Sequence, residues 1–208
     1  MAPENFHTNI FINCPFDKDY KSLLRPILFT IVYLGFNPRL ASERSDSLEQ
    51  RIDKILNLIK SCKYSVHDLS RLKAEKANDI FRLNMPFELG IEYGCRRIST
   101  NYLNGKRTLI LEKGLYDIKR ALSDLNGVDI KNHDNKPAKT VRALQHWFIE
   151  TVGVEVPHSP SVIWDRFNEF MYDFYVRRKK EGYSKGDMET MPIPQYIRFI
   201  KRWIDSNT

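Results

Sequence analysis

Short apolar segments that alternate with amphipathic helical segments most constrain how this chain can fold. Residues 9–13 are short, apolar and β-branched, as in a buried strand, and residues 20–34 follow with leucine and isoleucine at helical spacing. Further strands are expected at 36–41, 64–68 and 107–112, with an edge strand left open at 127–130, and further helices start near 47, 86 and 137. This order predicts a parallel sheet of four or five strands within residues 8–150, with helices on both faces.

The start of the predicted second helix carries a specific capping pattern. Ser47-Leu48-Glu49-Gln50 fits a capping box, with Ser47 as the N-cap and Gln50 reaching back to it. Apolar residues then recur at helical spacing from Leu48 to Ile59. We therefore expect this helix to begin directly after Ser47.

The composition of the chain shifts at residues 156–160, where two prolines fall close together. Two helices are expected beyond them, the second opened by Pro192 or Pro194. Their apolar side chains must be buried on the rest of the protein or on a second subunit, and the main ones are Phe167, Phe170, Phe174, Ile197 and Ile200. We therefore divide the chain into an α/β domain, residues 1–155, and a helical extension, residues 156–208.

Composition and charge favour a cytoplasmic protein that acts on an anionic ligand. The 208 residues contain no apolar run near the roughly 18 residues that span a membrane and no secretory signal, and the three cysteines show no metal-binding spacing. The net charge is +7, which attracts anions such as nucleotides. The basic residues are spread along the chain without a recognition helix, which argues against a nucleic-acid binder.

Polar residues follow three of the predicted strands and open one helix. In open α/β sheets the ligand crevice lies at the carboxyl ends of the strands, where these residues should meet. After the first strand they are Asn13 and Asp17, with the aromatic Phe16 beside them, and after the second strand they are Arg44 and Ser45. Asp68 and Ser70 follow the third strand, and Glu88, with Asn84 just before it, lies on the next helix. Because proline is tolerated where a helix begins, Pro86 predicts that Glu88 lies in the first helical turn.

Several residues in these segments also have an ordinary structural interpretation. Glu88 would offset the helix dipole, Asp68 would cap the following turn, and Arg51 would be a solvated helix residue. His67 is more typical of a satisfied core histidine than of a catalyst. Cys14 has no histidine partner near it in the sequence, which disfavours a thiol nucleophile.

The order of these motifs resembles a Toll/interleukin-1 receptor (TIR) domain. The resemblance rests on Ile10–Asn13, the helix around Gln50–Ile52, Asp68-Leu69-Ser70 and Glu88-Leu89. Phe87-Glu88-Leu89-Gly90 is also similar to the signature of nucleoside 2-deoxyribosyltransferases. Both families have a flavodoxin-like core. The chain departs from both in having Asn84-Met85-Pro86 ahead of the glutamate, where TIR enzymes commonly show Trp-Cys and the transferases Asp and Gly-Thr.

Both families act at N-glycosidic bonds, so the resemblance implies cleavage or transfer at this bond of NAD or a related nucleotide, which is the substrate rather than a cofactor. It assigns the catalytic role to Glu88, helped by Asp68. Arg44 and Arg51 would hold phosphates, and Asn13, Phe16 and Asp17 would line the opposite wall. It also implies bacterial antiviral defence and assembly with further copies or a partner protein. The alternative is a TIR-like assembly module without catalysis.

Overall fold

The computed structural model of the chain describes residues 1–72 and 83–207. In chain order, the elements of the α/β part are β1 (Asn9–Asn13), α1 (Lys21–Tyr33), β2 (Asn37–Arg39), the 3-10 turn η1 (Ala41–Glu43), α2 (Arg51–Ser61), β3 (Tyr64–Asp68), α3 (Asn84–Ile98), η2 (Tyr102–Gly105), β4 (Arg107–Glu112), α4 (Asp117–Ala121), η3 (Ser123–Leu125), β5 (Ile130–Asn132), α5 (Pro137–Trp147) and the π-helical turn η4 (Phe148–Val152). Three helices follow, α6 (Pro160–Lys180), α7 (Lys185–Thr190) and α8 (Ile193–Asn207).

The strands form one parallel sheet in the order β2-β1-β3-β4-β5. This is the strand order of flavodoxin-like sheets, and it confirms the predicted parallel α/β architecture. The order reverses between β1 and β3, where Asn13 pairs in register with His67. In such sheets the ligand crevice opens at this reversal, beyond the carboxyl ends of the two strands.

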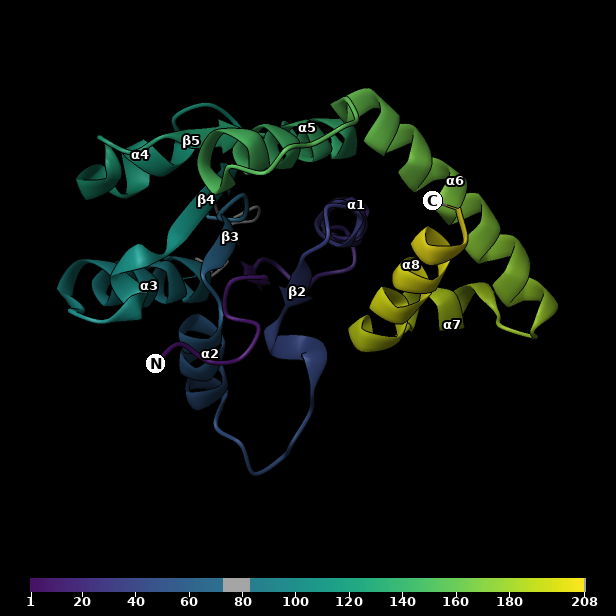
Figure 1. The fold of residues 1–208 in the computed structure, drawn as a ribbon, viewed down its shortest axis with the longest axis horizontal. Coiled ribbons are helices and arrows are strands. Elements are labelled where there is room, and N and C mark those ends of the chain that lie inside the picture. The colour runs from purple at the N-terminus through teal and green to yellow at the C-terminus, as the bar shows by residue number, and fades with distance from the viewer. Residues whose placement is uncertain (73–82, 208) are drawn as a thin grey trace, which may run out of the picture.

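Helices cover both faces of the sheet (Figure 1). On one face α1 and α5 pack against each other and bury the larger core, which includes Ile27, Phe29 and Leu144. On the other face α2 and α3 pack on β1 and β3, with Ile55 and Ile59 against Phe11. β1 and β3 are completely buried because helices cover them on both sides.

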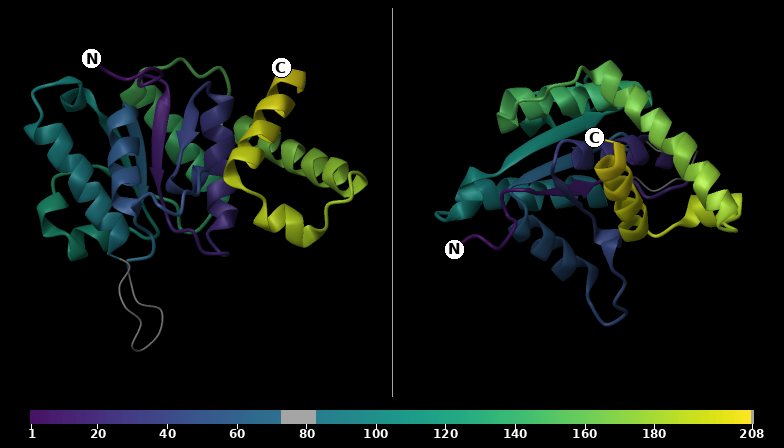
Figure 2. Two further views of the ribbon diagram at one scale, coloured as in Figure 1. Left: turned by 90° about the horizontal axis from the view of Figure 1, so that it is seen from below. Right: turned by 45° about the vertical axis from the view of Figure 1, so that its right-hand side comes forward.

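The helical extension packs on α1 beside the β2 edge of the sheet, as both views of Figure 2 show. The side chains of Phe167, Phe170, Phe174 and Ile200 are buried in the same core as Phe29 of α1, and Ile197 is partly buried against it. The extension contains a third helix, α7, that the sequence pattern did not predict. A capping box explains this helix, because Ser184 and Asp187 satisfy each other's backbone N–H groups.

Two predicted helix starts differ from the structure. α2 begins at Arg51 rather than after Ser47, because the Asp46 carboxylate accepts from Leu48 N–H and Glu49 turns toward Arg44. α3 begins at Asn84, two residues before Pro86. The missing N–H of proline costs nothing anywhere in the first helical turn, so Glu88 lies in the second turn instead of the first.

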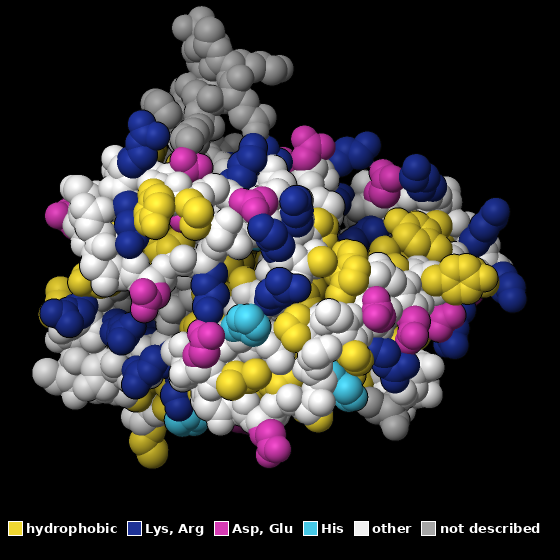
Figure 3. Space-filling model, turned by 90° about the horizontal axis from the view of Figure 1, so that it is seen from above, with side chains coloured by type: hydrophobic (Ala, Val, Ile, Leu, Met, Phe, Trp, Pro, Cys, Tyr) yellow, Lys and Arg dark blue, Asp and Glu magenta, His cyan; other side chains and the backbone are white. Residues whose placement is uncertain are grey.

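The surface carries mixed charge. Lys and Arg side chains are scattered among acidic ones over the face in Figure 3 rather than gathered in one patch. Within residues 1–72 and 83–207, no helix combines the length and apolar content that a membrane crossing requires.

Candidate active site

Glu88 is a buried carboxylate beside the reversal point of the sheet. Its residue is 5% exposed, and α3, which carries it, packs on both β1 and β3. Nη2 of Arg51, the first residue of α2, lies 3.1 Å from Glu88 Oε1. The Arg51 side chain is 57% exposed, so this ion pair joins a buried anion to a cation that reaches solvent.

The environment of Glu88 has opposing effects on its protonation. Burial raises the pKa of Glu88 above its usual value, while the charge and hydrogen bond of Arg51 lower it; the net shift is upward. A carboxylate with a raised pKa in a buried position is typical of functional sites. Because Glu88 lies in the second turn, burial and Arg51 govern its charge rather than the helix dipole.

Asn13 fixes the start of α3 against the sheet. Its Nδ2 group donates to the Met85 carbonyl oxygen at 2.9 Å and lies 3.0 Å from His67 Nδ1. With both amide hydrogens used in this way, His67 Nδ1 accepts and His67 Nε2 carries the proton. Asn13 therefore sets both the position of the Glu88 helix and the tautomer of His67.

His67 belongs to a fully buried network of charged and polar side chains. Its Nε2 lies 2.8 Å from Glu92 Oε2, and Lys106 Nζ lies 3.1 Å from Glu92 Oε1. Burial alone would raise the pKa of Glu92, but Lys106 and His67 outweigh it and lower this pKa to about 2. Lys106 also donates to the carbonyl oxygens of Ile59 and Cys62. The network is a buried structural cluster, and His67 is a core histidine as expected.

Asp68 is fully buried and its carboxylate is turned toward the protein. Oδ2 accepts from the Tyr20 hydroxyl at 2.6 Å and lies 3.2 Å from His133 Nε2. Oδ1 accepts from the Ser70 backbone N–H at 2.9 Å, which is the turn-capping contact considered from the sequence. Asp68 thus holds α1 and the segment after β5 against the end of β3, and its role toward substrate stays a prediction.

Cys14 and Ser70 lie in the two loops that flank the reversal point. Burial, followed by the charges of Asp68, Glu88 and Asp17, raises the pKa of Cys14 well above its usual value, so the thiol stays neutral. The Ser70 hydroxyl is buried and has no hydrogen-bond partner in the described part of the chain. A buried hydroxyl without a partner is uncommon in folded proteins.

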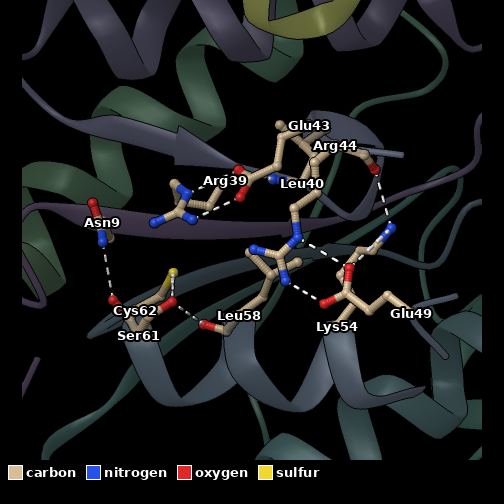
Figure 4. A network of polar contacts seen from close by, with 10 residues as sticks. All are labelled: Asn9, Arg39, Leu40, Glu43, Arg44, Glu49, Lys54, Leu58, Ser61 and Cys62. Atoms are coloured by element: carbon tan, nitrogen blue, oxygen red, sulfur yellow. Dashed lines mark hydrogen bonds and ion pairs between the residues drawn. The ribbon is translucent and has the colours of Figure 1, made fainter. Parts of the chain in front are cut away.

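The remaining predicted site residues lie farther out on the same rim. Arg44 is held by Glu49, with Nε 3.0 Å from Oε2, and Lys54 joins this cluster (Figure 4). Ser45 and Asn84 are exposed. Phe16 is 43% exposed, and Asp17 lies 3.6 Å from Arg71 of the loop after β3. The structure brings Glu88, Arg51 and Asn13 together, whereas Arg44 is engaged elsewhere; their binding roles stay predictions.

Sequence reasoning missed the residues that hold the site in place. Glu92 stands four residues after Glu88 on the buried side of α3, a spacing visible in the sequence. Lys106, Tyr20 and His133 have no local signal, because their partners lie 14 to 65 positions away along the chain. Only the fold brings these charges together.

Comparison with known proteins gives no further guide to the site. No family model, no curated protein and no solved structure matches this chain.

Proposed function

We propose that this protein is an enzyme that cleaves or transfers at the N-glycosidic bond of NAD or a related nucleotide. The observation that carries the proposal is the Glu88 carboxylate, buried at the reversal point of the sheet and paired with the exposed Arg51. A buried carboxylate at the carboxyl edge of the sheet is the kind of group that such chemistry requires. The resemblance of Phe87–Gly90 to glycosidic enzymes supports the same role.

The chemistry follows from the charge that develops on the sugar. When the bond between the anomeric carbon and the base nitrogen breaks, its electron pair leaves with the base and the sugar becomes positively charged. The Glu88 carboxylate stabilises that charge or captures the anomeric carbon covalently. Water, a hydroxyl of the same nucleotide or a second base then bonds to the carbon, which makes the reaction hydrolysis, cyclisation or exchange. Any bond to Glu88 breaks in this step and returns the carboxylate, and a water or hydroxyl acceptor gives up its proton.

The neighbouring groups take supporting roles in this proposal. Arg51 favours the ionised form of Glu88 before substrate arrives and, being largely exposed, can turn toward a substrate phosphate. Asn13 positions the Glu88 helix. The Ser70 hydroxyl offers a hydrogen bond to a ribose hydroxyl. Because both carboxylate oxygens of Asp68 contact protein groups, we treat Asp68 as a positioning residue.

Product analysis tests the proposal. Purified protein is incubated with NAD, ribonucleosides and deoxyribonucleosides, and the products are separated by liquid chromatography with mass detection. We expect release of free base from at least one of these substrates, and no release by Glu88→Gln. Glu169→Gln, on an exposed part of α6, is the matched control and should behave like wild type. Absence of base release in wild type, also with candidate partner proteins added, would favour the assembly-module alternative.

A further inference from the structure

A cavity of about 310 Å³ lies between the loop after β1 and the helical extension. One wall is formed by Phe16 and Asp17 of that loop and by α1, and Ser42 of η1 closes one side. The opposite wall belongs to α7, to α8 and to the residues between them. Two residues that the sequence assigns to substrate binding therefore share a cavity with the extension.

The wall that the extension contributes is anchored to α1. Lys21 Nζ donates to the Glu189 carbonyl oxygen at 2.6 Å, and Arg25 Nη2 donates to the Met188 carbonyl oxygen at 2.8 Å. The Arg25 guanidinium also lies over the Tyr196 ring, 5.3 Å from its centre. These contacts hold the cavity open in its present shape, as is usual for small-molecule sites.

The lining selects for an uncharged, flat and mostly apolar group. Most of it is aliphatic, thioether or aromatic, and Phe16, Tyr196, Met188 and Met191 offer ring faces and soft sulfur atoms. Two cations and two carboxylates reach the cavity, so its charges balance. A volume of about 310 Å³ is at the lower limit for small-molecule pockets, which suits one heterocyclic ring system rather than a whole dinucleotide.

The cavity is joined to Glu88 by five consecutive residues. Asn13 holds the start of the Glu88 helix through the Met85 carbonyl, and the chain continues from it through residues 14–17 into the cavity wall. Both places therefore lie at the carboxyl end of β1, one on each side of this loop. A nucleotide bound across the carboxyl end of β1 would have its sugar on the Glu88 side of this loop and its base on the cavity side.

We infer that this cavity is a base subsite, which binds a neutral nucleobase-like ring of the substrate and gives the helical extension control over substrate choice. The inference rests on the proposed function for the identity of the substrate. The binding of a heterocyclic ring in the cavity is measurable without turnover. Two readouts, one kinetic and one of binding, therefore separate failure of the subsite from failure of the enzyme.

The kinetic readout uses Met191→Trp, which fills the cavity from the wall that the extension contributes. Tyr172→Trp, at an exposed position of α6, is the matched control. For the substrate found by product analysis, we expect Met191→Trp to raise KM about tenfold or more, since 1.4 kcal/mol of lost binding is tenfold, with kcat little changed. Tyr172→Trp should leave both constants unchanged. An unchanged KM in a folded Met191→Trp variant would overturn the subsite and leave the proposed function standing.

The binding readout uses carbon-13 labelled methionine methyl groups in the wild-type protein. The chain has five methionines, of which Met188 and Met191 line the cavity and Met85 lies beside Glu88. Adenosine, inosine and nicotinamide, whose rings are uncharged, are added as probes. We expect at least one of them to shift the Met188 and Met191 signals, whether or not the protein turns it over. If none of the three shifts these two signals, the subsite is wrong, even where base release is observed.

Discussion

At the residue scale, two glutamates one helical turn apart on α3 have opposite environments. Glu92 contacts the fully buried Lys106 and His67, and its pKa falls to about 2 although burial acts to raise it. Glu88 has only the exposed Arg51 as an ion-pair partner in the described structure, and burial raises its pKa. The first arrangement stabilises the fold, and the second keeps a charge where it costs stability, which is typical of functional positions.

Replacing Glu88 by glutamine should not weaken the fold. Because its pKa is raised in the folded protein, the folded state favours the protonated form. Stability from this group is therefore full below the pKa of the unfolded chain and falls as pH rises through the folded pKa. At pH 7 we expect Glu88→Gln to melt at or above the wild-type temperature, and calorimetry measures this. A loss of several degrees at pH 7 would make Glu88 structural.

Glu92 should show the opposite pH dependence. Its folded pKa of about 2 lies below the value of an unfolded glutamate, so its contribution is full above about pH 4.5 and is lost as pH falls toward 2. Lys106→Met leaves the buried Glu92 carboxylate without this cation and with His67 as its remaining partner, and should cost about 3–5 kcal/mol at neutral pH. Urea titrations of Lys106→Met and of Lys106→Met with Glu92→Gln measure this. If the second change restores no stability, the two side chains are not coupled.

Arg51 should control the pH at which the enzyme becomes active. The Arg51 charge lowers the pKa of Glu88 against the effect of burial, so Arg51→Gln raises this pKa further. Since the proposed chemistry needs the ionised carboxylate, the acid side of the plot of kcat/KM against pH should move to higher pH in this variant. A profile of the same shape with only a lower maximum would show that Arg51 binds substrate without acting on Glu88.

At the element scale, local patterns predicted the three central strands well, and the edge strands and helix starts less well. The strand expected at 36–41 spans only Asn37–Arg39, and the one expected at 127–130 lies at Ile130–Asn132. Residues 9–13, 64–68 and 107–112 match β1, β3 and β4, because short apolar runs are a local signal. The predicted capping box at Ser47 was wrong, because Arg44 and Asp46 compete for the same turn. The placement of the predicted site residues at the carboxyl ends of the strands followed from the predicted parallel sheet. The side-chain pairings there could not be predicted, since they join residues far apart in sequence.

At the scale of the whole molecule, the α/β part and the extension share one core. Phe170 of α6 is 1% exposed and packs against the rings of Phe29, Phe174, Tyr196 and Trp203. Lys201 of α8 also reaches Asn37 of β2, with 3.0 Å between Nζ and Oδ1. The boundary expected at residue 155 therefore divides the chain by composition and does not separate two cores.

Truncation of Phe170 should destabilise the whole molecule at once. We expect Phe170→Ala to cost about 3–5 kcal/mol, as for other large-to-small core changes. Unfolding is followed by tryptophan fluorescence, which reports largely on the helices, and by circular dichroism, which reports on all elements. The two signals should give one shared midpoint. Two separated transitions, with only one moved by Phe170→Ala, would show that the extension unfolds independently.

The central claim is that the Glu88 carboxylate acts on the sugar of a nucleotide. The most direct test is the rate of base release at saturating substrate by wild type, Glu88→Gln and the Glu169→Gln control, each shown to be folded by its melting temperature. We predict that Glu88→Gln lowers kcat at least about a hundredfold, as loss of other electrostatic stabilisers does, while the control keeps the wild-type rate. Base release by folded Glu88→Gln at close to the wild-type rate would contradict the account.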